Sequence, residues 1–191
     1  MPSQYCRRYL ETTAGLIGEL SDEHIAAVAR RLWQAYLEDH QIFAFGNGGS
    51  SAAASHLVED LCKCIDYGPE QRRYRALALT DSVALITAWA NDTDYDQIFA
   101  EQLRNWVRPG DVVVAISGSG NSPNVLRGVE LANRVGAHTI GLTGMGGGQL
   151  KDLAHDAIVV PSSNMQQIED AHLVICHLIF CCLRDRVFHT D

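Results

Sequence analysis

The sequence has no long hydrophobic run and no excess of basic residues. No apolar stretch approaches the roughly 18 residues that a transmembrane helix needs, and residues 1–8 contain no apolar core of a signal peptide. Lys and Arg number 15 against 23 Asp and Glu, which gives a formal net charge of −8. A nucleic-acid surface needs clustered cations. We therefore expect a cytoplasmic protein that acts neither at a membrane nor on nucleic acid.

The six cysteines lack the spacing of a zinc ribbon. Cys62 and Cys64 are one residue apart, and Cys176, Cys181 and Cys182 fall in one apolar helical stretch. In the reducing cytoplasm a disulfide framework is not expected. We interpret the cysteines as free thiols that pack in the interior.

Linkers, repeats and low-complexity segments are also missing. A chain of 191 residues can bury one substantial core, so we expect a single domain over residues 1–191. Residues 1–38 carry two helical patterns, the second with Ser21 as its cap. These residues predict an N-terminal helical hairpin that packs against either the α/β core, residues 39–191, or a partner subunit.

From residue 41 onwards, strand patterns alternate with helical ones. Branched and aromatic runs predict strands at 41–45, 75–79, 111–116, 139–142 and 156–160, each followed by a helical stretch. The second of these stretches covers residues 82–107, and the last covers residues 164–188. Parallel strands joined by crossover helices form a sheet that is covered on both faces. The expected fold class is therefore α/β, a three-layer αβα sandwich around a five-stranded parallel sheet, closed by a long C-terminal helix.

A loop of small residues, Ser117 to Asn124, follows the third predicted strand. Gly118 and Gly120 allow the backbone to approach a ligand closely, and Pro123 suits the first helical position after a Ser122 cap. The N–H groups at this helix start would face an anion. The loop has no Lys or Arg, which excludes the nucleoside-triphosphate P-loop. A phosphate monoester on a small metabolite fits better; the alternative is a Ser/Gly-rich turn without a ligand.

Five motifs follow one another along the chain: FGNGGS (45–50), AND (90–92), RPGDV (108–112), ISGSGNSPN (116–124) and QIEDAH (167–172). Together they resemble the motifs of the SIS (sugar isomerase) domain proteins and, within them, the phosphoheptose isomerases. The resemblance covers nearly the whole chain. It implies a doubly wound, flavodoxin-like sheet and a homotetramer with active sites between subunits. It also implies conversion of sedoheptulose 7-phosphate to D-glycero-D-manno-heptose 7-phosphate, which feeds nucleotide-activated heptose synthesis.

The resemblance also implies the residues of the site. The catalytic positions of the family fall on Asp60 and His177, and a possible metal set falls on His56, Asp60, Glu169 and His177. The substrate-binding positions fall on the Gly/Ser loops and three further residues. They are Asn47, Gly48, Ser50, Asp92, Ser117, Gly118, Ser119, Ser122 and Glu169.

Two of these positions differ from the usual pattern of the family, which has Glu where this chain has Asp60 and Gln where it has Glu169. An aldose-ketose isomerisation through an enediol needs a base near C1 and C2 and an acid or metal at the oxygens. Asp60 is one methylene shorter than Glu, and a displacement of about 1 Å can cost roughly a hundredfold in rate. This loss of rate would be offset if the helix lay closer to the substrate, or if the neighbouring Glu59 acted in place of Asp60.

A divalent metal, zinc in particular, is the cofactor that these residues suggest. His56 and Asp60 are spaced i, i+4 and share one helix face. Two imidazoles and two carboxylates suit zinc or another divalent ion, and some phosphoheptose isomerases hold zinc at these positions. On a continuous helix, however, Glu169 and His177 lie about 12 Å apart. Either that helix begins after Glu169, or the two residues come from different subunits.

Several alternatives stay open at this point. His172 is interpreted as structural, and residues 144–148, a glycine-rich run, could line the site or form a flexible turn. Because Asp60 and Glu169 lie at the reactive centre, the substrate could be another sugar phosphate. A non-catalytic SIS adaptor or sugar-phosphate sensor, like the relative that binds the bacterial replication initiator, is the third possibility.

Overall fold

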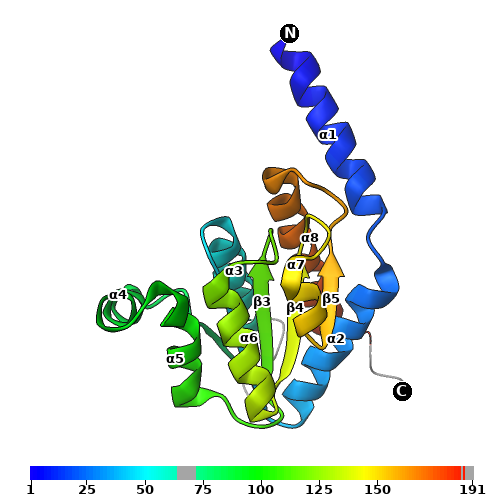
Figure 1. Cartoon of the computed structure of the whole chain (residues 1–191). Coiled ribbons are helices and arrows are strands. Elements are labelled where there is room, and N and C mark those ends of the chain that lie inside the picture. Colours follow the sequence, from blue (N-terminus) through cyan, green and yellow to red (C-terminus); the bar gives the residue numbers. More distant parts are fainter. Residues whose placement is uncertain (64–71, 186, 188–191) are drawn as a thin grey trace.

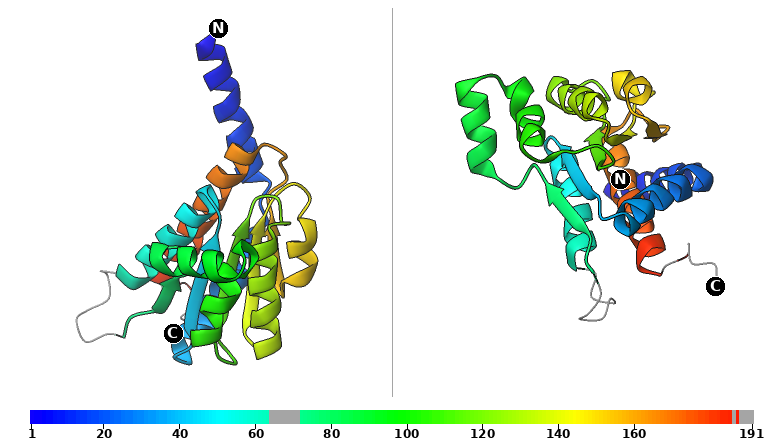
Figure 2. Two further views of the ribbon diagram at one scale, coloured as in Figure 1. Left: turned by 60° about the vertical axis from the view of Figure 1, so that its left-hand side comes forward. Right: turned by 90° about the horizontal axis from the view of Figure 1, so that it is seen from below.

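The computed structural model describes residues 1–63, 72–185 and 187 (Figure 1). It confirms the predicted α/β class. The sheet is five-stranded and wholly parallel, in the order β2-β1-β3-β4-β5, and helices cover both of its faces (Figure 2). The strands are β1 (Gln41–Gly46), β2 (Arg75–Ala78), β3 (Val112–Ser117), β4 (His138–Thr143) and β5 (Asp156–Val159).

The helices follow the predicted alternation. Two precede the first strand, and the others connect strands or close the chain. They are α1 (Pro2–Gly18), α2 (Asp22–Leu37), α3 (Gly49–Lys63), α4 (Val83–Asp92), the 3-10 helix η1 (Tyr95–Gln97), α5 (Ile98–Trp106), α6 (Pro123–Val135), α7 (Gly148–Leu153) and α8 (Met165–Arg184).

Alternating side chains on the central strands divide the core into two layers. Ile42 and Ala44 of β1 pack with α2, α3 and α8 on one face of the sheet. Phe43 and Phe45 pack with α5 and α6 on the other face, where Phe45 stacks on Phe99 with ring centroids 4.7 Å apart. Every residue of β3 is buried. This two-sided burial is the reason that a parallel sheet produces continuous apolar runs in the sequence.

The stretch predicted as helical from 82 to 107 is divided in the structure. Thr93 leaves the helical region with φ −131° and ψ −95°. The side chain of Asp94 then accepts a hydrogen bond from the N–H of Asp96 at 2.9 Å and starts η1. A local side-chain cap at Asp94 therefore competes successfully with helix continuation.

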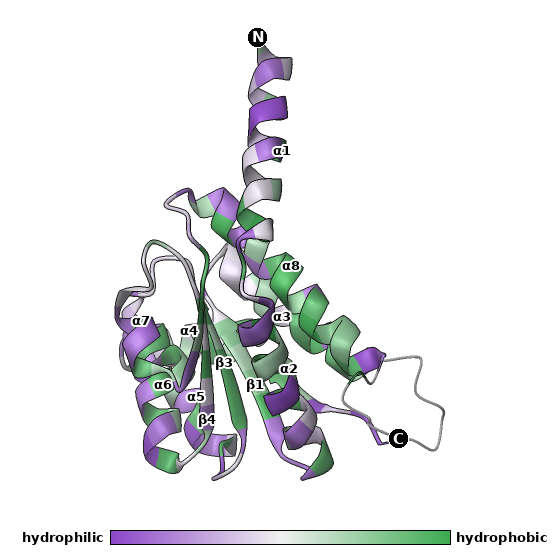
Figure 3. Ribbon diagram, turned by 90° about the vertical axis from the view of Figure 1, so that its right-hand side faces the viewer, coloured by the Kyte–Doolittle hydropathy of each residue, from purple (hydrophilic) through white to green (hydrophobic). Residues whose placement is uncertain are grey.

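The N-terminal helices form, but not as the predicted hairpin. Ser21 caps α2 as expected, accepting from the N–H of His24 at 3.2 Å. Helix α2 packs on the sheet, whereas α1 runs on past the body of the molecule instead of folding back on α2 (Figures 1 and 3). Only Leu16 of α1 is buried. Helix α1 contacts α8, where the Tyr9 hydroxyl donates to Oδ2 of Asp170 at 2.6 Å.

The cysteines follow the packing prediction only in part. Cys176 is buried, Cys181 and Cys182 are half-buried, and Cys6 and Cys62 are exposed. The prediction is wrong for these last two, because Cys6 lies on the projecting helix α1 and Cys62 near the exposed end of α3. Cys64 lies outside the described residues. Among the described helices, none combines the length and the apolar character needed to span a membrane.

Candidate active site

The site lies where the chain turns in opposite directions at the carboxyl ends of β1 and β3. After β1 the chain enters α3 on one face of the sheet, and after β3 it enters α6 on the other. Ligands of doubly wound sheets bind at such switch points. A cavity of ≈ 260 Å³ opens there. Its lining contains every predicted substrate-binding residue except Asp92: Asn47, Gly48, Ser50, Ser117, Gly118, Ser119, Ser122 and Glu169, together with Gly49, Ile116 and Met165.

The serine loop begins α6 in the predicted way, with one difference. Pro123 occupies the first helical turn and Ser122 is the N-cap residue, but the Ser122 side chain makes no capping hydrogen bond. Its Oγ lies instead 3.1 Å from Oγ of Ser117. The hydroxyl pair shares one hydrogen bond at the cavity wall, so the remaining lone pairs and proton are available to a ligand.

The start of α3 forms the opposite wall of the cavity. Gly48 has φ +56°, a conformation that glycine adopts without strain. The carboxylate of Glu169 lies directly against Gly49, in space that a side chain at this position would need. Glu169 therefore places a carboxylate at the positive end of the α3 dipole, where negative charge is stabilised.

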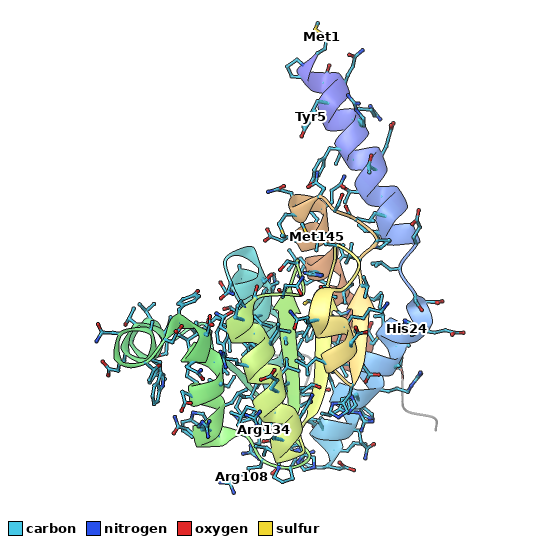
Figure 4. All side chains as sticks on the ribbon, in the orientation of Figure 1. Met1, Tyr5, His24, Arg108, Arg134 and Met145 are labelled. Carbon is cyan, nitrogen blue, oxygen red and sulfur yellow. The ribbon has the colours of Figure 1, made fainter. Side chains whose placement is uncertain are left out.

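The glycine-rich run, residues 144–148, does not line the cavity, and it is hydrogen-bonded to the serine loop. The N–H of Gly144 donates to the carbonyl of Gly118 at 3.0 Å, and the N–H of Leu150 donates to the carbonyl of Gly120 at 2.9 Å. A Cβ on Gly120 would collide with the carbonyl of Gly147, and a Cβ on Gly148 would collide with the backbone of Gly120, so neither position has room for a side chain. Through these backbone contacts the glycine-rich run holds the serine loop in place. Met145 lies at this end of the sheet, and Arg108 and Arg134 lie at the other end (Figure 4).

His56, Asp60 and His177 form a second polar group, on the packed helices α3 and α8 (Figure 3). Nε2 of His56 lies 3.2 Å from Nε2 of His177 and 3.8 Å from Oδ2 of Asp60. One ligand atom from each residue lies within 4.8 Å of the other two. The shorter Asp60 therefore reaches the group without help from Glu59. The three donors, two imidazole nitrogens and a carboxylate oxygen, suit a zinc or similar divalent ion with positions left open.

Glu169 does not join this group within one chain. Helix α8 is continuous from Met165 to Arg184, so the possibility that it begins after Glu169 is excluded. Glu169 faces the cavity, and among the described residues the candidate metal group consists of His56, Asp60 and His177. Only the hypothesis of different subunits can still bring Glu169 and His177 to one ion.

Asp92 is not brought to the cavity within one chain. It ends α4, a helix with no buried residue, and its carboxylate accepts from the amide of the neighbouring Asn91 at 2.8 Å. Figure 1 shows α4 at the outer edge of the molecule. Its role as a substrate contact stays a prediction that requires a second subunit.

His172 is fully buried, in agreement with the structural interpretation. Its Nε2 lies 3.2 Å from the carbonyl oxygen of Thr143, and Nδ1 is buried without a hydrogen-bond partner among the described residues. Burial lowers the pKa of His172 to about 4. The neutral ring donates to the end of β4, next to the glycine-rich run.

Three residues of the site were not predicted as functional. Met165 has no sequence signal, since it touches Gly118 only because α8 begins beside the serine loop. Tyr95 lies in the stretch predicted as continuous helix, and its hydroxyl reaches Oδ1 of Asn47 at 3.2 Å. Asn124 belongs to the quoted serine motif, and its side chain pairs with that of Asn47.

Comparisons with known proteins agree with this geometry. The SIS domain family model matches residues 4–144. The protein named "Probable phosphoheptose isomerase" from Thermoplasma acidophilum is 40% identical over 182 residues, which is 95% of this chain and 98% of the relative. The phosphoheptose isomerase of Geobacter sp. strain M21 is 38% identical over 180 residues, 94% and 92% of the two chains.

Solved structures show the same similarity. The phosphoheptose isomerase of Neisseria gonorrhoeae superposes with a TM-score of 0.89 at 28% identity, over 97% of this chain and 100% of the other. The enzyme of the same name from Francisella tularensis gives a TM-score of 0.90 at 28% identity, over 97% and 99%. The likeness therefore extends over the whole fold, including the strand-end loops.

Proposed function

Because the chain belongs to the SIS domain family and, within it, to the phosphoheptose isomerases, we propose that it converts sedoheptulose 7-phosphate to D-glycero-D-manno-heptose 7-phosphate in the cytoplasm. The protein is a sugar-phosphate isomerase by this relationship. The observation that carries the proposal is the cavity at the switch point, which gathers four serines between the starts of two helices. The heptose phosphate formed in this reaction feeds the synthesis of nucleotide-activated heptose.

The cavity binds the phosphate through neutral donors. Among the residues that the structure describes, no Lys or Arg lines it. Helices α3 and α6 both begin at its edge, and their first N–H groups and dipoles favour an anion. Hydroxyl donors supply the remaining hydrogen bonds. These hydroxyls belong to Ser50, Ser117, Ser119 and Ser122.

The proton transfer is assigned to Asp60 and His177. Isomerisation removes a proton from one carbon and returns it to the neighbouring carbon, and a carboxylate within reach of both can do this. Asp60 has two carboxylate oxygens, so one can remain in the His56–His177 group while the other accepts the proton. His177 is exposed; its Nε2 faces His56, so its other ring nitrogen, Nδ1, is the one that would donate to the substrate oxygen. A divalent ion held by His56, Asp60 and His177 would polarise the substrate oxygens.

We place the complete site between subunits of a homotetramer. The His56, Asp60 and His177 group does not line the cavity of its own chain, and Glu169 and His177 are about 12 Å apart along α8. Apolar residues are exposed where a partner could bind, among them Tyr5 and Leu10 on α1, 65% and 67% exposed, and Val83 on α4, 70% exposed. A neighbouring subunit would bring its His56, Asp60 and His177 group, or its Asp92, to each cavity.

The adaptor hypothesis is not favoured by the structure. An adaptor has no physical need for two imidazoles and a carboxylate in one group, and such a group is present. The possibility of another sugar phosphate is tested by offering the enzyme other ketose phosphates in the same assay.

The deciding experiment incubates the protein with sedoheptulose 7-phosphate, with and without a chelator, and follows aldose formation. We expect turnover that the chelator abolishes and that zinc or another divalent ion restores. Metal analysis of the purified protein and its molar mass in solution test the cofactor and the tetramer. Absence of turnover, together with absence of sugar-phosphate binding, contradicts the proposal.

A further inference from the structure

Two asparagine side chains link the two loops of the cavity. Asn47 follows β1 and lines the cavity, whereas Asn124 lies in the first turn of α6, is 1% exposed and does not line it. Nδ2 of Asn47 donates to Oδ1 of Asn124 at 2.9 Å, and Nδ2 of Asn124 donates to Oδ1 of Asn47 at 2.9 Å. This reciprocal pair crosses the switch point between β1 and β3.

The backbone fixes the orientation of both amides. The N–H of Val125 donates to Oδ1 of Asn124 at 2.9 Å, and a backbone N–H can only donate. Oδ1 of Asn124 must therefore be the oxygen, which in turn requires Nδ2 of Asn47 to face it. The Tyr95 hydroxyl, 3.2 Å from Oδ1 of Asn47, must donate as well. The usual ambiguity between the oxygen and nitrogen of an amide is removed by this chain of contacts.

The count of donors and acceptors leaves one group of Asn47 unused. Its Oδ1 already accepts two hydrogen bonds, from Asn124 and Tyr95, which occupy both lone pairs. Its Nδ2 uses one of two protons on Asn124. The remaining N–H is therefore the hydrogen-bonding group that Asn47 can offer to a ligand.

We propose that Asn124 is a positioning residue that presents Asn47 to the ligand as a donor and prevents its carbonyl from facing the ligand. The proposal rests on the proposed function, since the ligand is taken to be a phosphorylated sugar. Phosphate oxygens are acceptors only, so a donor at this position is complementary to them, whereas a rotated amide would place its oxygen against negative charge. Fixing the amide before the ligand arrives also reduces the ordering cost of binding.

A double-mutant cycle on ligand affinity tests this assignment. Asn47→Ala and Asn124→Ala are each expected to weaken binding of sedoheptulose 7-phosphate by about fivefold to tenfold, the range of one hydrogen bond. If Asn124 acts through Asn47, the double variant binds no more weakly than Asn47→Ala. Calorimetric titration with sedoheptulose 7-phosphate, and with inorganic phosphate as the second probe, measures the affinities. Losses that add in the double variant overturn the inference.

Two further variants keep the test valid if Asn124→Ala folds poorly. Tyr95→Phe removes one donor to Oδ1 of Asn47 from a residue that is 53% exposed, and its smaller loss of affinity should vanish in the Asn47→Ala background. Asn124→Asp keeps both acceptor contacts but cannot donate to Asn47, so it should also weaken binding. The matched control is Asn133→Asp on the same helix, which loses donation to the carbonyl of Leu153 and should leave affinity unchanged.

The outcomes separate the inference from the proposed function. A wild-type protein that binds sedoheptulose 7-phosphate without turnover contradicts the proposed function, and the cycle still decides the role of Asn124. Equal loss of affinity in Asn133→Asp and Asn124→Asp would indicate a general effect on α6 and overturn the inference. A wild-type protein that binds neither probe overturns both.

Discussion

The serine-lined cavity and the group formed by His56, Asp60 and His177 both include residues of α3 and α8 but differ in how far one chain completes them. In the cavity, Ser117 and Ser50 are 4% and 5% exposed, and backbone hydrogen bonds from the glycine-rich run hold the serine loop. In the second group, the His56 and Asp60 side chains are 42% and 18% exposed. The fold of one chain completes the cavity that we propose to bind phosphate, whereas the group that we propose to be catalytic is left open towards solvent or a partner.

His177→Ala should give the largest difference between the two regions, in rate as against phosphate affinity. Removing a general acid typically costs about 10²–10⁴-fold in rate, and the cavity does not contain His177. We therefore expect kcat for sedoheptulose 7-phosphate to fall by that factor, while the affinity for inorganic phosphate stays within about twofold, well under the loss of one hydrogen bond. Steady-state kinetics and calorimetry measure the two quantities.

His24→Ala, on the exposed first turn of α2, is the control for His177→Ala. It should change neither the rate nor the affinity. A parallel loss of phosphate affinity in His177→Ala would show that the histidine group takes part in phosphate binding.

Asp60→Glu tests the same difference by lengthening a side chain of the histidine group instead of removing one. The group is built with the shorter side chain, since Oδ2 of Asp60 is already 3.8 Å from Nε2 of His56. Lengthening it by one methylene displaces the carboxylate by about 1 Å, which can cost roughly a hundredfold in kcat. Phosphate affinity should be unchanged. A faster enzyme would instead show that Asp60 is a poor substitute for the Glu that is usual in the family.

The pH dependence of stability tests how firmly the cavity is supported. The pKa of His172 is about 4 in the folded protein because of burial, against 6.5 when unperturbed. Between these values the unfolded chain binds more protons, so stability rises with pH and is lost as the pH falls from 6.5 towards 4. The total loss is about 3 kcal/mol. Denaturant unfolding at several pH values measures it.

His172→Phe is the matched variant for that measurement. It should have lower stability at pH 7, since the hydrogen bond to Thr143 is lost, but a flatter dependence on pH. Burial also lowers the pKa of His138, which contributes in the same direction and remains in both proteins. An unchanged slope in the variant would contradict the assignment to His172.

Gly49→Ala should have the smallest effect on the whole protein and a selective effect on the cavity. A methyl group there collides with the Glu169 carboxylate, which is the end of a flexible side chain and must move aside. We expect weaker sugar-phosphate binding with the histidine group intact. Gly15→Ala, on α1 with open space around it, is the control. Unchanged affinity in Gly49→Ala would place Glu169 outside the binding site.

The strand-end loops were predictable because their chemistry is local. Glycines, serines and a first-turn proline follow β3 directly, and the strand fixes where they lie, so Ser117, Ser119 and Ser122 are found in the cavity as the sequence indicates. The spacing of His56 and Asp60 likewise follows from one helix. The hairpin at the N-terminus was wrong, because α1 contacts α8 and only its Leu16 is buried. Residues 82–107 are largely helical as predicted, but the division of this stretch was not foreseen, because it depends on one side-chain hydrogen bond at Asp94.

The sequence by itself therefore determined the α/β class, the parallel sheet and the Gly/Ser loops at the strand ends, since periodicity and loop composition act over a few residues. Only the tertiary structure decided that His177 meets His56, that Glu169 lies against Gly49 and not with the histidines, and that Asn124 pairs with Asn47. Each of these contacts joins residues far apart in the chain. Their geometry depends on how helices pack across the sheet, and no local pattern records it.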